Sequence, residues 1–470
     1  MIPGRTSWSR CTLTALLLLP GLLKGAPALE HQTLRKDVNS AAEHLTWRKD
    51  KNSVDADITS WDLIKTLEQI SEATGWQIYY EPGAKRAVST KFKDRQTDRA
   101  LDLLLGELGR VLLPGTNGGP SRLLVFRTHE KDATQLIRRG RKAKPIPDEL
   151  IVTMKAGKSV DDLAKKLGAK VIGKSSGLNS GRLKFENEDA ANAARDALRD
   201  DEDVASTDPN FPVSSTPVPE GTGAPSAPNL KLQPVREGEG LIIGLIDTAV
   251  QRQGGPFDGF LLPAISVSGD AALSPDRPSH GTSMFETLLR GISVFDDGGG
   301  ASRVRVLPVD VYGNSPSTTT YEVAEGIYLA MQQGAQIINL SLGSEGDTPY
   351  LYQVIRSGTD SGRIFIGSAG NLPVTTPTFP AAYPEVIAVT AGDAPGRLAP
   401  YANRGNFIDV MAPGTSVVSY NGQAWRVNGT SPAAAYISGA IAGTADTRGG
   451  SLAQAAASVQ RSLPPPRPAP

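Results

Sequence analysis

The sequence predicts an α/β protein: a doubly wound, mostly parallel sheet that is preceded by two small α+β domains. Three observations indicate this arrangement. From residue 241 onward, short apolar runs alternate with helical stretches, which is typical of a parallel sheet covered by helices on both faces. The segments 54–128 and 148–211 each mix helical and alternating patterns over the length of a small domain. A Pro-rich stretch, 212–236, then precedes the main domain.

The amino-acid composition argues against several classes of function. It has 470 residues, and 49 Lys and Arg balance 49 Asp and Glu, which argues against a dedicated nucleic-acid-binding protein. Cys11 is the one cysteine, and three of the four histidines, His31, His44 and His129, lie before residue 130. If Cys11 is removed by processing, disulfides, a cysteine nucleophile and cysteine-bound zinc are excluded. Histidine chemistry in the main domain therefore depends on His280.

Residues 1–28 have the pattern of a secretory signal peptide. Arg5 and Arg10 form a positively charged start, 13–23 is an apolar core, and 26–28 fit a small-x-small cleavage site. The apolar core is too short for a membrane span, and no later stretch is long enough. We therefore expect an exported protein, secreted or held in the periplasm or cell envelope of a bacterium, without a membrane span.

The segment 54–128 predicts the first α+β domain. Asp62 can cap a helix, 76–80 alternates as a strand, and Thr97 opens a second helix before a closing hairpin. The polar residues 29–53 show no clear period, so we expect a spacer there.

The same domain contains the stretches LIKTLEQISEATGWQIYY and ALDLLLGELG, which resemble the short N-terminal domain of secretins and TonB-dependent receptors. The resemblance implies a docking module for a partner in the cell envelope. An unrelated βαβ-type domain is the alternative.

The segment 148–211 predicts a second α+β domain with the order β-α-β-β-α-β, the split βαβ arrangement. Within it, residues 173–177 (GKSSG) match the G-x-S-x-G motif of serine hydrolases. That motif requires a helix immediately after the serine, whereas residues 178–181 lead into another strand. We therefore expect that Ser175 is not a nucleophile.

Two Pro-rich segments bound the main domain, which we place at 237–450. Five prolines lie between residues 212 and 228, so 212–236 is expected to be an extended linker and a place for processing. The segment 462–470 is expected to be a disordered tail.

The main domain places polar residues at the ends of buried strands. Asp247 directly follows the first apolar run, Ser341 follows the third, and Asn371 lies shortly after the fourth. Functional side chains gather at the carboxyl ends of parallel strands, so we expect these three at one edge of the sheet. The expected strands are 241–246, 304–311, 337–340, 364–366, 386–389 and 407–411, with a helix at 321–332.

His280 and Ser431 each stand at the start of a predicted helix, and we expect Pro432 at the first helical position. A serine there has its hydroxyl and N–H at the positive end of the helix dipole, where an oxyanion is favoured. The hydroxyl needs a base that works near neutral pH, and the imidazole of a histidine needs a carboxylate to fix its tautomer. Asp247, His280 and Ser431 could supply all three groups.

Five motifs in this order resemble those of the subtilisin-like serine peptidases, over residues 238–445. The motifs are LIIGLIDTAV around Asp247, SHGTSM around His280, AQIINLSLGS around Ser341, IGSAGN ending at Asn371, and VNGTSPAAAYISGAIAG around Ser431. The resemblance implies a subtilisin-like fold and a serine endopeptidase that acts on polypeptides.

The resemblance also implies a role for each residue. Asp247 orients the imidazole, His280 is the general base and acid, and Ser431 attacks to form an acyl-enzyme. Asn371 donates its side-chain amide to the oxyanion. The backbone of a short strand is expected to pair with an extended substrate: Ser341, Leu342 and Gly343.

The segment 148–211 in turn looks like a subtilase propeptide. This implies a zymogen whose propeptide assists folding and inhibits the site as an intramolecular partner, until the chain cuts itself between Phe211 and about Leu241. No cofactor is required by this chemistry. Calcium is common in the family, but no acidic cluster in the sequence specifies a site.

The motifs also depart from the family pattern. Ala249 stands where glycine is usual, Ser283 where a second histidine often stands, and Pro432 directly after the serine. Two other functions therefore stay open: a catalytically impaired binding protein with the subtilase fold, and an envelope docking protein.

Overall fold

The computed structural model describes residues 43–465, except 49, 82–83, 116–119, 138–142, 215–216, 223–227, 229, 235–239, 296–299 and 394–396. The predicted signal peptide at 1–28 and most of the predicted tail lie outside the described residues. Within the described ranges, no helix is both long and apolar enough to cross a bilayer.

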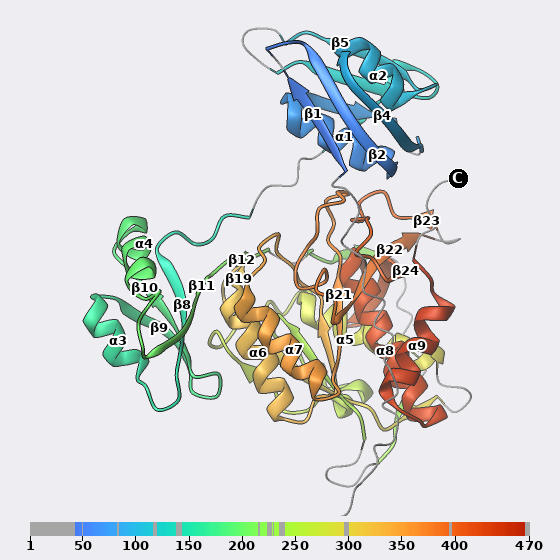
Figure 1. Cartoon of the computed structure of the whole chain (residues 1–470). Coiled ribbons are helices and arrows are strands. Elements are labelled where there is room, and N and C mark those ends of the chain that lie inside the picture. The colour runs from blue at the N-terminus through green and yellow to red at the C-terminus, as the bar shows by residue number, and fades with distance from the viewer. Residues whose placement is uncertain are drawn as a thin grey trace, which may run out of the picture. The chain divides into compact units, whose positions relative to one another are not determined.

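The described part of the first domain contains two α-helices, a short 3-10 helix (Glu130–Asp132) and two small sheets, with the strand orders β1-β2-β4 and β5-β6-β3-β7 (Figure 1). Helix α1 begins where predicted, because the carboxylate of Asp62 accepts a hydrogen bond from the N–H of Lys65. The elements are β1 (His44–Arg48), β2 (Ser53–Asp62), α1 (Leu63–Thr74), β3 (Gln77–Tyr80), β4 (Ala87–Gln96), α2 (Thr97–Leu105), β5 (Gly109–Leu113), β6 (Arg122–Phe126) and β7 (Gln135–Leu136).

The spacer expected at 29–53 is wrong for its last ten residues. Strand β1 lies there and pairs with β2 in antiparallel fashion. Trp47 packs edge-on against Trp76, with ring centroids 5.5 Å apart, and Leu45 also reaches the core of the domain. The first domain therefore begins ten residues before the predicted boundary at 54.

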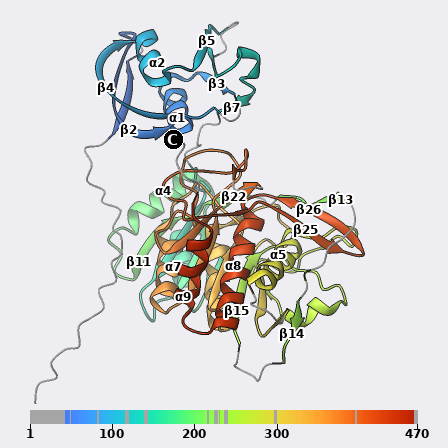
Figure 2. The same cartoon turned by 90° about the vertical axis from the view of Figure 1, so that its right-hand side faces the viewer.

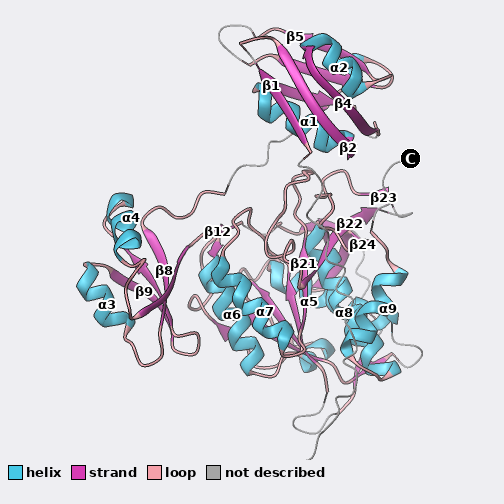
Figure 3. Ribbon diagram, in the orientation of Figure 1, coloured by secondary structure: helices cyan, strands magenta, loops and turns pink. Residues whose placement is uncertain are grey.

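The second domain has the predicted order β-α-β-β-α-β. Its antiparallel sheet has the order β11-β8-β10-β9, and both helices lie on one side of it (Figure 3). Ser175 ends β9 and is followed by a turn rather than a helix, as expected. The elements are β8 (Glu149–Met154), α3 (Val160–Leu167), β9 (Lys170–Ser175), β10 (Ser180–Lys184), α4 (Glu188–Ala197) and β11 (Val204–Pro209).

The main domain is built on an eight-stranded sheet with the order β16-β18-β15-β20-β21-β22-β23, in which β24 also pairs with β22. All neighbours are parallel except β22 and β23, which confirms the predicted doubly wound, mostly parallel sheet. The strands are β15 (Ile242–Asp247), β16 (Ile265–Ser266), β18 (Arg305–Asp310), β20 (Ile337–Leu340), β21 (Ile364–Ser368), β22 (Val386–Asp393), β23 (Arg397–Leu398) and β24 (Val410–Pro413).

Helices cover both faces of this sheet (Figures 1 and 2). Alternate residues of β15 face opposite ways: Ile243 joins the core under α5 and α8, whereas Ile246 joins the core under α6 and α7. This two-sided burial explains the unbroken apolar run at 241–246. The helices are α5 (His280–Phe295), α6 (Thr320–Gln332), α7 (Pro349–Asp360), α8 (Thr430–Arg448) and α9 (Leu452–Ser462).

Two predicted boundaries in this domain are wrong. Helix α9 lies beyond the predicted end at 450, because Ala455, Ala456 and Val459 pack into the same core as α8. Helix α8 begins at Thr430 with Gly429 as its N-cap, so Pro432 is the third helical residue rather than the first. The position tolerates proline because N–H groups in the first turn have no partner within the helix.

The described pieces of the Pro-rich segment 212–236 include three short strands that pair with the main domain, whereas a linker without partners was expected. The side chains of Val213 and Leu230 are buried. Edge strands offer unpaired backbone groups, and three short pieces of this segment pair with them. Strand β12 (Pro212–Val213) pairs with β19 (Thr318–Thr319), β13 (Glu220–Thr222) with β26 (Gln423–Asn428), which also pairs with β25 (Thr415–Tyr420), and β14 (Lys231–Leu232) with β17 (Ala301–Ser302).

Helices α5 and α8 pack with their main chains almost in contact. A Cβ atom added to Gly439 would lie 2.0 Å from the carbonyl oxygen of Leu288, and one added to Gly291 would lie 2.2 Å from that of Tyr436. Only glycine permits such an approach. Because α5 begins at His280 and α8 begins at Thr430, this packing fixes the two helix starts relative to each other.

We predict that Gly439→Ala destabilises the main domain by about 1–3 kcal/mol, the usual cost of overpacking a core. Thermal unfolding of the full chain tests this, measured in a Ser431→Ala background so that the self-cleavage expected from the sequence cannot interfere. Gly255→Ala is the matched control, since a Cβ there meets open space, and it should change stability by less than about 0.5 kcal/mol. Equal melting temperatures for the two variants would contradict the close packing.

Candidate active site

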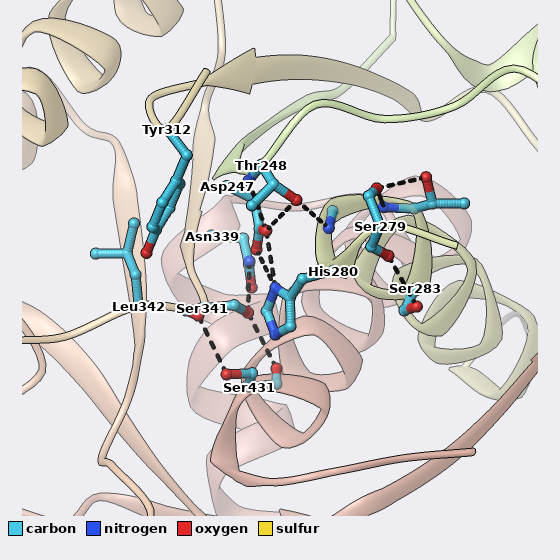
Figure 4. A network of polar contacts seen from close by, with 12 residues as sticks. Asp247, Thr248, Ser279, His280, Ser283, Tyr312, Asn339, Ser341, Leu342 and Ser431 are labelled. Carbon is cyan, nitrogen blue, oxygen red and sulfur yellow. Dashed lines mark hydrogen bonds and ion pairs between the residues drawn. The ribbon is translucent and has the colours of Figure 1, made fainter. Parts of the chain in front are cut away.

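Asp247 ends β15 at the carboxyl edge of the sheet and is fully buried. One carboxylate oxygen accepts a hydrogen bond from the N–H of Thr248 at 2.7 Å. Both carboxylate oxygens lie within hydrogen-bond distance of Nδ1 of His280, at 2.8 and 3.0 Å. The carboxylate therefore holds the imidazole through Nδ1 and leaves Nε2 pointing the other way (Figure 4).

His280 is the first residue of α5, and its position depends on a glycine. A Cβ added to Gly281 would lie 2.1 Å from the carbonyl oxygen of Thr248, so the start of α5 can approach the end of β15 only with glycine there. The Gly281 N–H also donates to the hydroxyl of Thr248 at 2.8 Å. These contacts join the residues after Asp247 to the residue after His280.

A buried glutamine, Gln251, reinforces the same junction. Its Oε1 accepts from the N–H of Ser279 at 2.7 Å, and its own N–H donates to the hydroxyl of Thr282 at 2.8 Å. Its Nε2 donates to the carbonyl oxygen of Ser274 and to the hydroxyl of Tyr420. Sequence analysis did not identify Gln251, because its partners are scattered along the chain.

Ser431 is the second residue of α8, directly across from His280 (Figure 4). Its hydroxyl donates to the carbonyl oxygen of Ser341 at 3.1 Å. Among the described residues, Nε2 of His280 is buried and has no hydrogen-bond partner. The Ser431 hydroxyl is therefore bonded to a main-chain oxygen and not to Nε2. Catalytic hydrogen bonds often form only when substrate is bound.

A series of buried hydrogen bonds holds the backbone of Ser431 in place. The hydroxyl of Ser341 donates to the carbonyl oxygen of Ser431 at 3.0 Å and accepts from Nδ2 of Asn339 at 2.9 Å. The hydroxyl of Ser438 in turn donates to Oδ1 of Asn339 at 3.0 Å. This chain ties the first turn of α8 to β20, and neither Asn339 nor Ser438 was singled out from the sequence.

Asn371 lies beside the start of α8. Its Oδ1 accepts from the N–H of Thr430 at 2.8 Å and from the Thr430 hydroxyl at 3.1 Å. Its Nδ2 lies near Gly429, where an added Cβ would be 3.0 Å from it. The two bonds to Oδ1 leave the amide hydrogens of Nδ2 for another acceptor next to Ser431.

Two further polar groups are buried near Asp247. Burial raises the pKa of Asp310, which accepts hydrogen bonds from the N–H groups of Tyr312 and Gly313. Burial also raises the pKa of the Tyr312 phenol, and the nearby carboxylates add to that effect. Asp310 and Tyr312 thus lie in the same buried region as the Asp247–His280 pair.

The backbone expected to bind substrate, residues 341–343, is contacted by another part of the same chain, the segment around Ser214. The N–H of Ser214 donates to the carbonyl oxygen of Gly343 at 3.2 Å, and the Tyr312 hydroxyl donates to the carbonyl oxygen of Ser214 at 3.1 Å. Val213 is buried in the same apolar cluster as Leu342. An open hollow of about 370 Å³ lies beside His280. These contacts hold the backbone at Ser214 beside Gly343 and Tyr312.

The structure brings all the residues that we expected in the site to one edge of the sheet. A serine hydroxyl, an imidazole held by a buried carboxylate, a free side-chain amide and an extended-backbone groove are the components of acyl transfer from a peptide. The described residues contain no cluster of three or more His, Cys, Asp or Glu side chains that could hold a metal ion. The residues concerned are Asp247, His280, Asn371, Ser431, Ser341, Leu342 and Gly343.

Comparison with known families gives two matches. The Subtilase family (Peptidase_S8) matches residues 238–456, which covers most of the main domain. The fervidolysin N-terminal prodomain matches residues 131–210, which includes most of the second domain.

Individual relatives agree with the family match. Subtilisin Savinase of Lederbergia lenta is 30% identical over 227 residues, which is 47% of this chain and 80% of that protein. An alkaline protease of Alkalihalobacillus alcalophilus is also 30% identical over 227 residues, but this chain spans only 56% of its length. The crystal structure of fervidolysin from Fervidobacterium pennivorans, described as a keratinolytic enzyme related to subtilisin, shares the fold with a TM-score of 0.52. It is 18% identical, and the match covers 67% of this chain and 57% of that one.

We predict that the neutral imidazole of His280 carries its proton on Nδ1, because that nitrogen faces the Asp247 carboxylate. NMR of the Ser431→Ala chain with isotope-labelled histidine would detect this proton. Asp247→Asn should move the proton to Nε2, since an asparagine amide can donate to Nδ1. The signals of His44 and His129 serve as controls and should not move. An unchanged His280 signal in Asp247→Asn would contradict the prediction.

Proposed function

This chain belongs to the subtilase family of serine endopeptidases, and we propose that it hydrolyses peptide bonds in polypeptides through Asp247, His280 and Ser431. The observation that carries the proposal is the buried Asp247–His280 pair, whose free Nε2 faces a serine at a helix start. A peptide segment paired with the neighbouring strand supports it.

In the proposed reaction, the Ser431 hydroxyl turns from the carbonyl oxygen of Ser341 to Nε2 of His280. The imidazole takes the proton as Oγ attacks the substrate carbonyl carbon, and Asp247 stabilises the imidazolium. The N–H of Ser431 and Nδ2 of Asn371 donate to the oxyanion, and one such donor is typically worth about 3 kcal/mol. His280 then protonates the leaving amine, and water releases the acyl group by the same steps. No cofactor takes part.

We further propose that the second domain, the prodomain, inhibits the site in a zymogen and is released after the chain cuts itself between Phe211 and about Leu241. Several contacts support this. The carbonyl oxygen of Phe211 accepts from the N–H of Thr320 at 3.0 Å, and Arg182 forms ion pairs with Glu149 of the prodomain and Glu322 of α6.

More contacts anchor the prodomain on α6 and α7. The side-chain oxygen of Asn210 accepts from the hydroxyl of Thr320 at 3.1 Å and from the N–H of Tyr321 at 3.2 Å. The hydroxyls of Ser180 and Tyr350 lie 2.7 Å apart, and the rings of Tyr321 and Tyr350 are stacked. The prodomain is therefore held against α6 and α7 by both polar and aromatic groups.

The sequence also supports a proposed location. The signal-like pattern at 1–28 favours export to the bacterial cell envelope or beyond. The first domain would then dock the peptidase to an envelope partner, as its resemblance to the short domain of secretins and TonB-dependent receptors suggests. A pull-down with the full chain and with a chain lacking the whole first domain, residues 44–137, would test that partner.

We predict that wild-type protein shortens on incubation and cleaves added casein, whereas Ser431→Ala stays full length and inactive. Mass spectrometry and a serine-directed fluorophosphonate label provide the measurements. Ser361→Ala, a change at an exposed serine, should behave as wild type. If wild type matches Ser431→Ala in all three assays, the chain is the impaired binding protein and the peptidase proposal fails.

We predict that the prodomain docks more weakly as the pH rises. Burial raises the pKa of Glu325, which faces Ser175 of the prodomain, and of Asp208, which lies against Tyr350. Undocking exposes Glu325 and returns its pKa toward 4.5, so the docked state binds more protons. Docking is therefore strongest at low pH. It weakens as the pH rises from about 4.5, the pKa of an exposed glutamate, through the higher pKa that Glu325 has in the docked state.

Denaturation of the Ser431→Ala chain at about pH 5 and about pH 8 measures this loss. In that background, Glu325→Gln keeps a side-chain acceptor but cannot ionise, so it should reduce the loss of stability between the two pH values. Glu188→Gln, at an exposed glutamate of the prodomain, is the control and should leave the loss unchanged. The same pH dependence in all three chains would rule out Glu325 as a contributor.

A further inference from the structure

The open hollow of about 370 Å³ beside His280 has walls from two loops. The first wall comes from the loop 271–279, which leads into α5, and the second from 313–316, which follows β18. Thr248 and Ala249 also line the hollow. A side chain held there would therefore lie next to the imidazole that we propose as the general base.

Contacts between the two loops fix the shape of the hollow. Oδ1 of Asn314 accepts from the N–H of Ala272 at 2.6 Å, and its Nδ2 donates to the carbonyl oxygen of Asp270 at 2.9 Å. Gly313 has a φ of 56°, and a Cβ added there would lie 2.5 Å from the carbonyl oxygen of Ser268. Because the walls are joined in this way, the hollow is formed before a substrate binds.

Arg277 lies in the first wall, on a backbone that two side chains hold. Its carbonyl oxygen accepts from Nε2 of Gln251 at 3.2 Å, and the same nitrogen donates to the carbonyl oxygen of Ser274 at 2.7 Å. Nδ2 of Asn421 donates to the carbonyl oxygen of Pro275 at 2.8 Å. The side chain of Arg277 itself is exposed. A binding group on a fixed backbone loses less freedom when it meets its ligand.

The charge of the hollow is of one sign. Among the described residues that line it, Arg277 is the only one with a full charge at neutral pH, and none carries a carboxylate. The imidazole of His280 is the other group that can become charged, and its charge would also be positive. The Arg277 side chain has no ion pair with another described residue. The hollow therefore suits a carboxylate, which a guanidinium binds through two parallel hydrogen bonds.

The segment around Ser214 shows how an extended backbone passes the hollow. The N–H of Ser214 donates to the carbonyl oxygen of Gly343 at 3.2 Å, and its carbonyl oxygen accepts from the Tyr312 hydroxyl at 3.1 Å. Tyr312 directly precedes Gly313 in the second wall. A substrate that pairs with residues 341–343 would therefore run beside the hollow.

The register of such a substrate selects one of its side chains. In an antiparallel pair, the residue level with Gly343 comes two residues before the residue level with Ser341. The carbonyl oxygen of Ser341 is 3.1 Å from the Ser431 hydroxyl, so the residue level with Ser341 is the last one before the cleaved bond. The residue between the two is level with Leu342 and projects to the same face as that side chain. Leu342 is buried in one apolar cluster with Tyr312, so this face is the one that leads to the hollow.

We propose that Arg277 makes the site prefer an acidic residue, Asp or Glu, at the second position before the cleaved bond. The carboxylate of that residue enters the hollow and accepts hydrogen bonds from the guanidinium. The inference rests on the proposed peptidase activity. It adds a specificity-determining residue and narrows the substrates to polypeptides with an acidic side chain at this position.

The test measures kcat/KM of the full-length chain, after incubation, for peptide anilides of the form Ala-Ala-X-Z. Release of the aniline fixes the cleaved bond, X is Glu, Gln or Lys, and Z is an equal mixture of Ala, Leu and Phe. In wild type we expect kcat/KM for Glu to exceed that for Gln about 3–10-fold, the size of a partly exposed ion pair. Arg277→Gln should abolish this preference, and Arg277→Glu should favour Lys over Gln. A purely structural role of Arg277 would not produce such a reversal.

Three controls accompany the measurement. Arg461→Gln, a change at an exposed arginine of α9, should keep the preference of wild type. The Gln peptide should be cleaved equally well by all four chains, which shows that each is folded. The preference of wild type for Glu should shrink between about 0.05 M and about 1 M salt, because ions screen the attraction.

The inference is overturned if wild type and Arg277→Gln have the same ratio of kcat/KM for Glu and Gln. It is also overturned if Glu raises kcat/KM at the third position before the cleaved bond and not at the second, since the register would then be wrong. If wild type cleaves none of the peptides and does not react with a fluorophosphonate, the peptidase activity itself is absent, and the inference falls with it.

Discussion

The close approach of α5 and α8 is the constraint on which the site depends. His280 and Ser431 are 151 positions apart in sequence, and each sits in the first turn of its helix. Neither helix can shift without moving one of the two groups that we propose to react. Glycines at 291 and 439 remove the side chains that would otherwise separate the helices, so the main chains themselves set the spacing. The spacing between His280 and Ser431 is therefore set by helix packing at positions away from the site itself.

The imidazole of His280 is held by more contacts than the hydroxyl of Ser431. The imidazole is fixed by a buried carboxylate, by a glycine contact and by the Gln251 network, so it has little freedom. Among the described residues, the Ser431 hydroxyl has one hydrogen bond, to the carbonyl oxygen of Ser341, directly after β20. In the proposed reaction, a substrate that pairs with residues 341–343 competes for the same oxygen. Its binding would then release the hydroxyl toward the imidazole.

Much of the fold and most of the candidate site could be predicted because their signals are local. A strand buried on both faces leaves an unbroken apolar run, as at 241–246, and each reacting residue lies in a short motif of its own. Contacts between distant segments left no such signal. Gln251 joins residues 274, 279, 282 and 420, and nothing around it in the sequence indicates those partners. Strand β13 is held by its backbone, so its residues Glu-Gly-Thr give no strand pattern.

Helix α6 has consequences for the order in which the chain assembles. Its N-cap residue, Thr319, makes no side-chain capping bond. Three donors at its start are instead satisfied by Asn210 and Phe211, at the end of the prodomain. The first turn of the helix is thus capped by residues of the prodomain rather than by its own N-cap residue. If the prodomain is removed as proposed, these three donors lose their protein acceptors, while the rest of the helix stays packed in its core. A chain made without residues 148–211 is therefore expected to close this turn less readily than the full chain does.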